Sequence, residues 1–226
     1  MTLAELEEVR EFMGNAHYVL DARASQLTVQ AFAEGLAGIA DHRPQFSVRE
    51  FSAELEFDPE ELEGGALRLV AKAGSLEIMD EVSQKDRKAI EGIISEVLNP
   101  QLYPEVVFRS SRVVCSRVDV SRYRAEVLGM VNLHGEENEQ AIQAQLILTE
   151  GSLRAHGEFR LRQSDFGLTI ASVAGGLLRI KDELKFMFFL VSRKQNGASQ
   201  TPGINGEPSG KIFGSGSERS ARGQSA

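Results

Sequence analysis

The chain has 226 residues, 42% of them hydrophobic, and a formal net charge of -8. A chain of this length can bury one good core, and β-barrels of similar length usually form a single domain. The acidic balance argues against nucleic acid or an anionic membrane surface as the main partner. No apolar run is long enough to be an integral membrane segment.

The amino-terminal stretch, residues 1–15, predicts a short helix. Thr2 and Glu5 form a capping-box pattern. One face is apolar, made by Leu3, Leu6, Val9 and Met13. We expect this helix to pack on the body of the protein, with a partner-binding role as the alternative. The acidic start does not read as a secretory signal, so we expect a cytoplasmic protein.

From Ala16 the apolar residues recur with a period of two, which predicts β-strands. Strands with an apolar face are expected at 27–31, 51–58, 67–73, 106–110, 125–133, 142–148, 153–162 and 184–191. The last strand is apolar on both faces. We therefore expect its outer face to be covered by the amino-terminal helix or by a second subunit, as in a homodimer.

One internal helix is predicted over 84–98, where the apolar residues follow a helical period and Asn99-Pro100 ends the pattern. Pro104 then biases Tyr103 towards an extended backbone, so the chain turns sharply into a strand. A helix between long strands suggests that it closes one end of a barrel. Tyr103 is expected to set the angle between this helix and the barrel.

The carboxy-terminal segment, 194–226, is rich in Gly and Ser and predicts a disordered tail. The remaining 16–193 predict an all-β fold, an antiparallel barrel of about eight strands. Such a barrel either fills with side chains or holds one small ligand. Small inward residues such as Ala144 and Gly157 permit a tunnel for a long apolar ligand, and they equally permit a packed core.

The residues expected to line such a tunnel are the large apolar side chains on the inward positions. They are Leu27, Val29, Phe51, Leu55, Phe57, Leu67, Leu69, Phe108, Val131, Leu133, Leu146, Phe159, Leu161, Phe166, Leu168, Phe186 and Phe188.

Few residues could take part in metal binding, catalysis or contacts to a ligand headgroup. The four histidines are scattered without ligand spacing, so no metal site is predicted. The lone Cys115 excludes an intramolecular disulfide and reads as a small buried residue. His134, Arg162 and Asp165 are the candidates for contacts to a ligand headgroup. We expect Asp165 to bond its own backbone in a tight loop, Ser164–Gly167.

Six ordered segments together resemble the YceI-like lipid- and polyisoprenoid-binding family. They are Tyr18–Asp21 with Ser25 and Val29, Phe51–Pro59, Tyr103-Pro104 with Phe108 and Ser110, Gly129 with Leu133–Gly135, Ser164–Gly167, and Asp182–Leu184. The resemblance implies an extended, lipocalin-like barrel with a helix near one end. It also implies a non-covalently bound polyisoprenoid, such as an isoprenoid quinone or a polyprenyl chain, with no cofactor and no catalysis.

The sequence departs from the family pattern at three places. Gln163 stands where the family has Arg directly before the Ser-Asp-Phe-Gly loop, and Arg162 lies one residue earlier. In a strand that offset places the guanidinium on the opposite face. Residues 85–90 and 136–139 also differ from the family's runs.

Three hypotheses follow. The first is a carrier of a long apolar lipid. The second is an enzyme acting on such a lipid, with His134 and Asp165 as general acid and base. The third is a dimeric interaction or stress-response protein, whose two-faced last strand or tail recruits a partner.

Overall fold

The computed structural model describes the backbone of residues 16–35, 43–58, 62–168 and 178–195. The predicted amino-terminal helix and the predicted tail beyond residue 195 lie outside the described residues.

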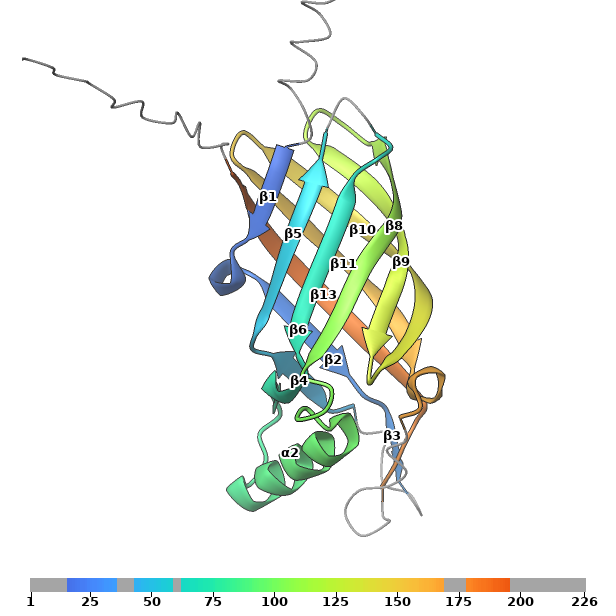
Figure 1. Cartoon of the computed structure of the whole chain (residues 1–226). Helices are drawn as coiled ribbons and strands as arrows, with labels where there is room; N and C mark the ends of the chain where they lie inside the picture. Colours follow the sequence, from blue (N-terminus) through green and yellow to red (C-terminus); the bar gives the residue numbers. More distant parts are fainter. Residues whose placement is uncertain (1–15, 36–42, 59–61, 169–177, 196–226) are drawn as a thin grey trace, which may run out of the picture. The chain divides into compact units, whose positions relative to one another are not determined.

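Eight antiparallel strands close into a barrel (Figure 1). In sheet order they are β1 (Ala16–Leu20), β5 (Phe51–Phe57), β6 (Ala66–Lys72), β8 (Glu105–Arg117), β9 (Arg122–Leu133), β10 (Glu136–Thr149), β11 (Ser152–Arg162) and β13 (Glu183–Lys194). The ladder closes where β13 pairs with β1. Alternate side chains point into the barrel, which is why a period of two appears in the sequence. The predicted all-β, lipocalin-like fold is confirmed.

The strand β13 has two successive partners on one edge. β1 pairs with its last residues, as in Leu20 opposite Ser192. β2 (Gln26–Gln30) pairs with its first half, as in Leu27 opposite Phe188. A single turn of 3₁₀-helix, η1 (Ala22–Ala24), separates β1 from β2.

The sheet therefore closes at one end only. At the other end it continues from β2 to β4 (Gln45–Val48) and β7 (Leu76–Ile78), and in the described residues it does not return to β5 or β6. A separate two-stranded sheet joins β3 (Ala33–Gly35) to β12 (Leu178–Ile180). Two further 3₁₀ turns, η2 (Ala73–Ser75) and η3 (Gln163–Phe166), follow β6 and β11.

The helix α2 (Gln84–Leu98) lies beside the end where the sheet stays open (Figure 1). Its predicted bounds are confirmed, because the stop and start signals are local. Ser83 caps the first turn by accepting a bond from the Asp86 amide (3.2 Å), and Asn99 ends the helix in the left-handed region. Ile90 and Ile94 pack on the β2–β4–β7 side, while Leu98 packs on the barrel core.

Tyr103 joins the exit of α2 to a hairpin of the barrel. His134 (φ 56°) and Gly135 (φ 83°) form a two-residue turn of the I′ kind between β9 and β10. The Tyr103 ring packs at a tilt against His134, with ring centroids 4.2 Å apart and planes inclined by 50°. A Cβ on Gly135 would lie only 2.8 Å from Tyr103 Cε1. Glycine at this turn thus permits both the backbone conformation and the approach of the ring.

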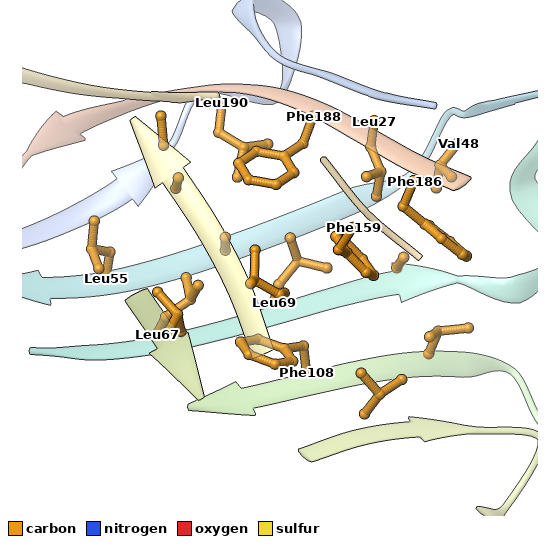
Figure 2. A pocket seen from close by; sticks show the side chains of 18 of the residues that line it. Leu27, Val48, Leu55, Leu67, Leu69, Phe108, Phe159, Phe186, Phe188 and Leu190 are labelled. Atoms are coloured by element: carbon orange, nitrogen blue, oxygen red, sulfur yellow. The ribbon is translucent and has the colours of Figure 1, made fainter. Parts of the chain in front are cut away.

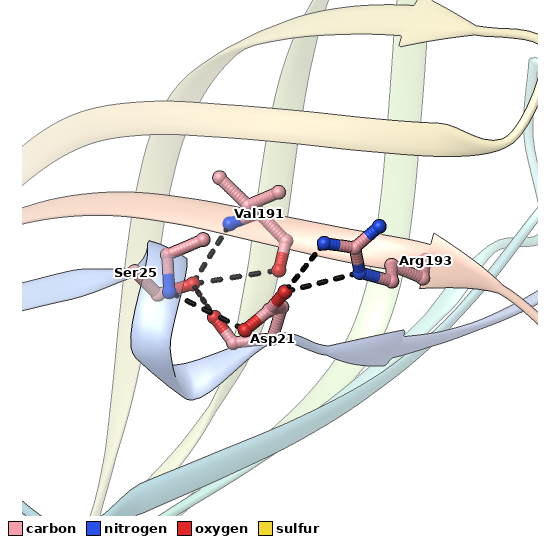
Figure 3. A network of polar contacts seen from close by, with 5 residues as sticks. Asp21, Ser25, Val191 and Arg193 are labelled. Atoms are coloured by element: carbon pink, nitrogen blue, oxygen red, sulfur yellow. Dashed lines mark hydrogen bonds and ion pairs between the residues drawn. The ribbon is translucent and has the colours of Figure 1, made fainter.

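A polar clamp holds the break between β1 and β2 against β13 (Figure 3). Arg193 donates two bonds to Asp21 Oδ2, at 3.0 and 2.8 Å. The Ser25 hydroxyl donates to the Asp21 carbonyl (2.7 Å) and accepts from the Val191 amide (2.9 Å). The bond from Arg193, together with the Ala24 amide, holds the pKa of Asp21 below its ordinary value.

We predict that Asp21→Asn lowers stability in a pH-dependent way, because it keeps the capping oxygen and removes only the charge. A carboxyl with a depressed folded pKa stabilises the fold above its unfolded pKa, whose ordinary value is 3.8. That contribution disappears as the pH falls through the folded pKa. Urea unfolding of both proteins from pH 7 to pH 2 should show a constant difference that shrinks below about pH 4. A gap that persists at the lowest pH would contradict the assignment.

The partner offers an internal check on this clamp. Arg193→Gln should give the same pH profile as Asp21→Asn, and the double variant should be little worse than either single one, since both remove the same pair.

We predict that Gly135→Ala destabilises the protein by about 1–3 kcal/mol, through backbone strain and the clash with Tyr103. Replacing Tyr103 by Ala in the same chain should recover part of this loss, because only the strain then remains. Chemical denaturation of the two single variants and the double variant measures this coupling. Strictly additive losses would show that the ring and the turn do not touch.

Candidate functional site

An apolar cavity of about 210 Å³ runs inside the barrel (Figure 2). Its wall comes from every barrel strand except β1, with β2, β4, β7 and the end of α2 added. Lys72 is the one charged residue among the lining side chains described, and Ser192 and Cys115 add small polar atoms. The cavity therefore presents a hydrocarbon surface to whatever occupies it.

Most of the predicted lining residues border this cavity. Phe51 and Phe166 do not. Phe51 is in phase with Ala53, but it lies beyond the part of β5 that pairs with β1, so its ring borders an outer groove instead. Phe166 is 1% exposed and packs into the barrel core from η3 without reaching the lumen. That the other residues contact a ligand stays a prediction.

The sequence reasoning missed several lining residues. They include Val48, Leu76, Leu98, Val106, Val113, Val127, Ile142, Leu153, Leu184 and Leu190. Most of those inside the barrel strands share the inward phase of predicted neighbours, so strand alternation could have found them. Val113 is out of phase with Phe108, because the register of β8 shifts between Ser110 and Arg112. Val48, Leu76 and Leu98 come from β4, β7 and α2, and only the three-dimensional arrangement brings them to the cavity.

The barrel interior is hollow at its middle. Phe159, Phe186 and Phe188 point inward yet remain only partly buried. In a packed protein core such rings are enclosed by neighbours at close-packed density. Here Phe159 and Phe186 stack on each other, with centroids 5.0 Å apart and planes inclined by 10°. The large aromatic residues thus border the cavity and do not fill it.

Two inward glycines let phenyl rings lie close to the barrel wall. A Cβ on Gly157 would lie 2.7 Å from Phe188 Cζ and 2.4 Å from the Gln143 carbonyl oxygen. A Cβ on Gly129 would lie 2.6 Å from Phe108 Cζ. Each phenyl ring therefore occupies the space above a glycine and lies against the strand. A larger residue at either glycine would push the ring into the lumen.

The cavity is sealed at the end away from α2. Phe57 and Tyr123 pack edge to face, with centroids 5.6 Å apart, and Tyr18 is buried beside them. Desolvation by burial raises the pKa of Tyr18 and of the Cys115 thiol, so both stay protonated at neutral pH. Neither group presents a nucleophile to the cavity.

The other end carries the polar rim. Lys72 lies half exposed there, with its Nζ 2.6 Å from Glu105 Oε1. Along β13 the inward positions run from Leu184 to Ser192, a distance of roughly 26 Å. The cavity is thus long for its volume, and it runs from the sealed end towards α2.

The three predicted headgroup residues do not line the cavity. His134 packs at a tilt against Tyr103 in the hairpin turn. Arg162 is exposed at the end of β11. Asp165 supplies its backbone carbonyl to Asn138 Nδ2, at 2.6 Å. The residues therefore gather at the α2 end but serve turns and loops.

The loop 164–167 corrects one sequence expectation. Its carboxylate partner is Asp182, not Asp165: Asp182 accepts bonds from the Ser164 amide (2.8 Å) and hydroxyl (2.7 Å). The bonds from Ser164 hold the pKa of Asp182 below its usual range. Gln163, at the family's arginine position, is buried and donates to the Lys181 carbonyl at 2.8 Å. Both contacts join η3 to the segment before β13.

Within the described ranges, no cluster of His, Cys, Asp and Glu has the makings of a metal site. None of the described helices has the length and apolar character needed to cross a membrane.

The comparisons agree with this fold. A model of the YceI-like domain matches residues 18–191. The chain is similar to Burkholderia cenocepacia BcnA, with 16% identity over 76% of this chain and 98% of that one and a TM-score of 0.58. It is also similar to a polyisoprenoid-binding domain from Saccharophagus degradans implicated in plant cell wall breakdown, with 15% identity, coverages of 80% and 99%, and a TM-score of 0.59.

A third structure, the Campylobacter jejuni YceI protein, has 14% identity over 67% of this chain and 85% of that one, with a TM-score of 0.51. At these identities the structural likeness shows the fold. No curated protein matches the chain.

We predict opposite effects for the same substitution at two glycines. Gly157→Ala should destabilise the protein by about 1–3 kcal/mol, since its Cβ collides with a backbone carbonyl and with Phe188. Gly92→Ala, on α2 with open space around it, should stabilise by about 0.5–1 kcal/mol. Thermal or urea unfolding decides this. Equal effects at both sites would mean that Gly157 does not support the ring.

Proposed function

Because the chain belongs to the YceI-like domain family, we propose that it binds one linear apolar lipid inside the barrel and carries it without chemistry. The observation that carries this proposal is the hollow interior with its almost entirely hydrocarbon wall. Only transfer of apolar surface from water can provide the affinity in such a cavity.

The energetics are favourable for a chain lipid. Burying about 400 Å² of alkyl surface corresponds to roughly 10 kcal/mol, at about 25 cal/mol per Å². Part of this offsets the loss of translational and rotational freedom on binding. The remainder suffices for tight binding without a salt bridge or a hydrogen bond to the chain.

The shape of the cavity narrows the class of lipid. Its volume of about 210 Å³ is spread along roughly 26 Å of strand, so its cross-section is small. One extended chain fits this form better than a fused-ring lipid. A polyisoprenoid is the favoured kind, as an isoprenoid quinone or a polyprenyl chain. The Saccharophagus degradans relative, described as a polyisoprenoid-binding domain, supports this choice.

A non-enzymatic role is part of the proposal. His134 and Asp165, the candidate acid and base, belong to a turn and a 3₁₀ segment outside the cavity wall. No side chain with a perturbed pKa faces the lumen as a charged group in the described part of the chain, because burial keeps the Cys115 thiol protonated. We therefore assign the cavity to binding and transport.

Two further expectations from the sequence remain predictions: a cytoplasmic location and a homodimer. Cell fractionation tests the first, and light scattering on the purified protein tests the second.

We predict that organic extraction of the purified protein followed by mass spectrometry releases a polyprenyl lipid or an isoprenoid quinone. Ala155→Phe, which places a ring in the middle of the cavity, should shorten the bound chain or lower its occupancy about tenfold, since about 1.4 kcal/mol is lost. The matched control is Ala141→Phe, at an exposed position of β10. It should retain the natural ligand.

Two results would overturn the proposal. One is a protein that yields no apolar lipid and takes up none of a fluorescent prenyl probe. The other is equal loss of binding in Ala155→Phe and Ala141→Phe, which would point to a site outside the lumen.

A further inference from the structure

The outer face of β13 carries an apolar stripe that the cavity does not use. It consists of Met187, Phe189 and Val191, which alternate with the lining residues of the same strand. Phe189 is 44% exposed, although large aromatic side chains are normally buried. A stripe of this kind marks a contact surface more often than an isolated exposed residue does.

A groove of about 750 Å³ adjoins the stripe, beside η1 and the outer side of β4 and β7. Phe51, Met79 and Phe189 give it apolar patches, and Met79 is 46% exposed. Arg23, Arg49 and Arg87 also line it, against a single carboxylate among the described residues, Glu77, which pairs with Arg49.

The β11 side of the stripe is mixed in charge. On β11, Arg154 lies directly opposite Val191, His156 opposite Phe189 and Glu158 opposite Met187. Glu158 forms an ion pair with Lys185 of β13, at 2.6 Å. The basic margin of the stripe is therefore the groove side, with Arg154 adding one cation on the β11 side. Such a surface favours a partner with an apolar face and carboxylates along its flanks.

We propose that the chain's own segment 1–13 docks on this stripe and groove as an amphipathic helix. Its apolar face, Leu3, Leu6, Val9 and Met13, would cover Phe189. Glu5, Glu7, Glu8 and Glu11 would meet the arginines, and the segment contains one basic residue, Arg10. Both the apolar pattern and the charge of the segment thus complement the surface.

The geometry of the chain allows this docking. β1 begins at Ala16, and its Tyr18 lies level with Lys194 of β13. Lys194 is five strand residues from Phe189, and Ala16 lies two residues further along β1, so the level of Ala16 is about seven strand residues, roughly 23 Å, from Phe189. A 13-residue helix is about 20 Å long, and Gly14-Asn15 add up to about 7 Å. A segment folded back along β1 therefore reaches Phe189 with little length to spare.

The other occupants fit less well. A second copy joined by a two-fold axis would contribute the same basic surface to the interface, so the groove arginines of both copies would share it without added carboxylates. The segment 196–226 carries Lys211, Arg219 and Arg222 among its charges, so it does not complement a basic margin. An anionic membrane surface would have to attract a chain with a net charge of -8.

The chain has no tryptophan, so Phe189→Trp makes a specific reporter in the full-length protein. Docking predicts that the indole introduced by this substitution is shielded, and that adding Leu6→Asp raises its acrylamide quenching about threefold by releasing the segment. The matched control is Met130→Trp, on the outer face of β9 at a position that is 38% exposed. Its quenching should not respond to Leu6→Asp.

A second measurement needs no reporter. Trypsin cleavage after Arg10 should be slow in the natural chain and about tenfold faster in Phe189→Ser or in Arg23→Glu/Arg154→Glu, because undocking exposes the bond. Equal cleavage in all variants, or equal quenching of the Phe189→Trp reporter with and without Leu6→Asp, overturns the proposal. Shielding of that reporter that depends on protein concentration assigns the stripe to a dimer and overturns it as well.

Discussion

The two bonds from Arg193 to Asp21, and the Ser25 hydroxyl shared with Val191, hold the chain where β1 ends and β2 begins. Because β13 exchanges one partner for the other at this point, the barrel is closed on one side of the clamp. On the far side the sheet runs on through β2, β4 and β7. The cavity therefore has one end sealed by packed aromatic rings and one end bordered by α2.

A barrel of eight strands can be solid or hollow, and here side-chain volume decides between them. Phe108 and Phe188 would fill more of the lumen if their rings stood away from the wall. The rings approach the wall closely because Gly129 and Gly157 leave room on the neighbouring strand. The interior thus combines aromatic surface, which gives affinity for apolar chains, with free volume. Replacing either inward glycine by a larger residue would push a ring into the lumen and reduce the free volume.

Local signals predicted what depends on local structure. The bounds of α2 follow from a cap at Ser83, a helical period and an αL residue at Asn99, all within one stretch of chain. Strand alternation likewise placed most lining residues in the correct phase. Phe51 failed because its surroundings depend on where β5 leaves its neighbour β1. That boundary depends on the pairing of β1 with β5 and β13, strands that are far apart in sequence.

The sequence predicted the kind of group that holds the loop after β11, but not the residue that supplies it. A carboxylate was expected to hold the Ser164–Gly167 loop, and one does, but it comes from Asp182. Short range in sequence favoured Asp165, while the antiparallel pairing of β11 with β13 brings Asp182 beside Ser164. The choice between two carboxylates is made by strand register, which a local pattern does not contain.

Both faces of β13 are apolar, and each face has its own reason to be so. Leu184, Phe186 and Phe188 line the cavity, while Met187, Phe189 and Val191 lie on the outside. Since strand alternation normally makes one face polar, apolar residues on both faces require a cover for each. A lipid inside and the acidic amino-terminal segment outside would supply both covers. Release of that segment would then expose the outer face of the strand whose inner face lines the cavity.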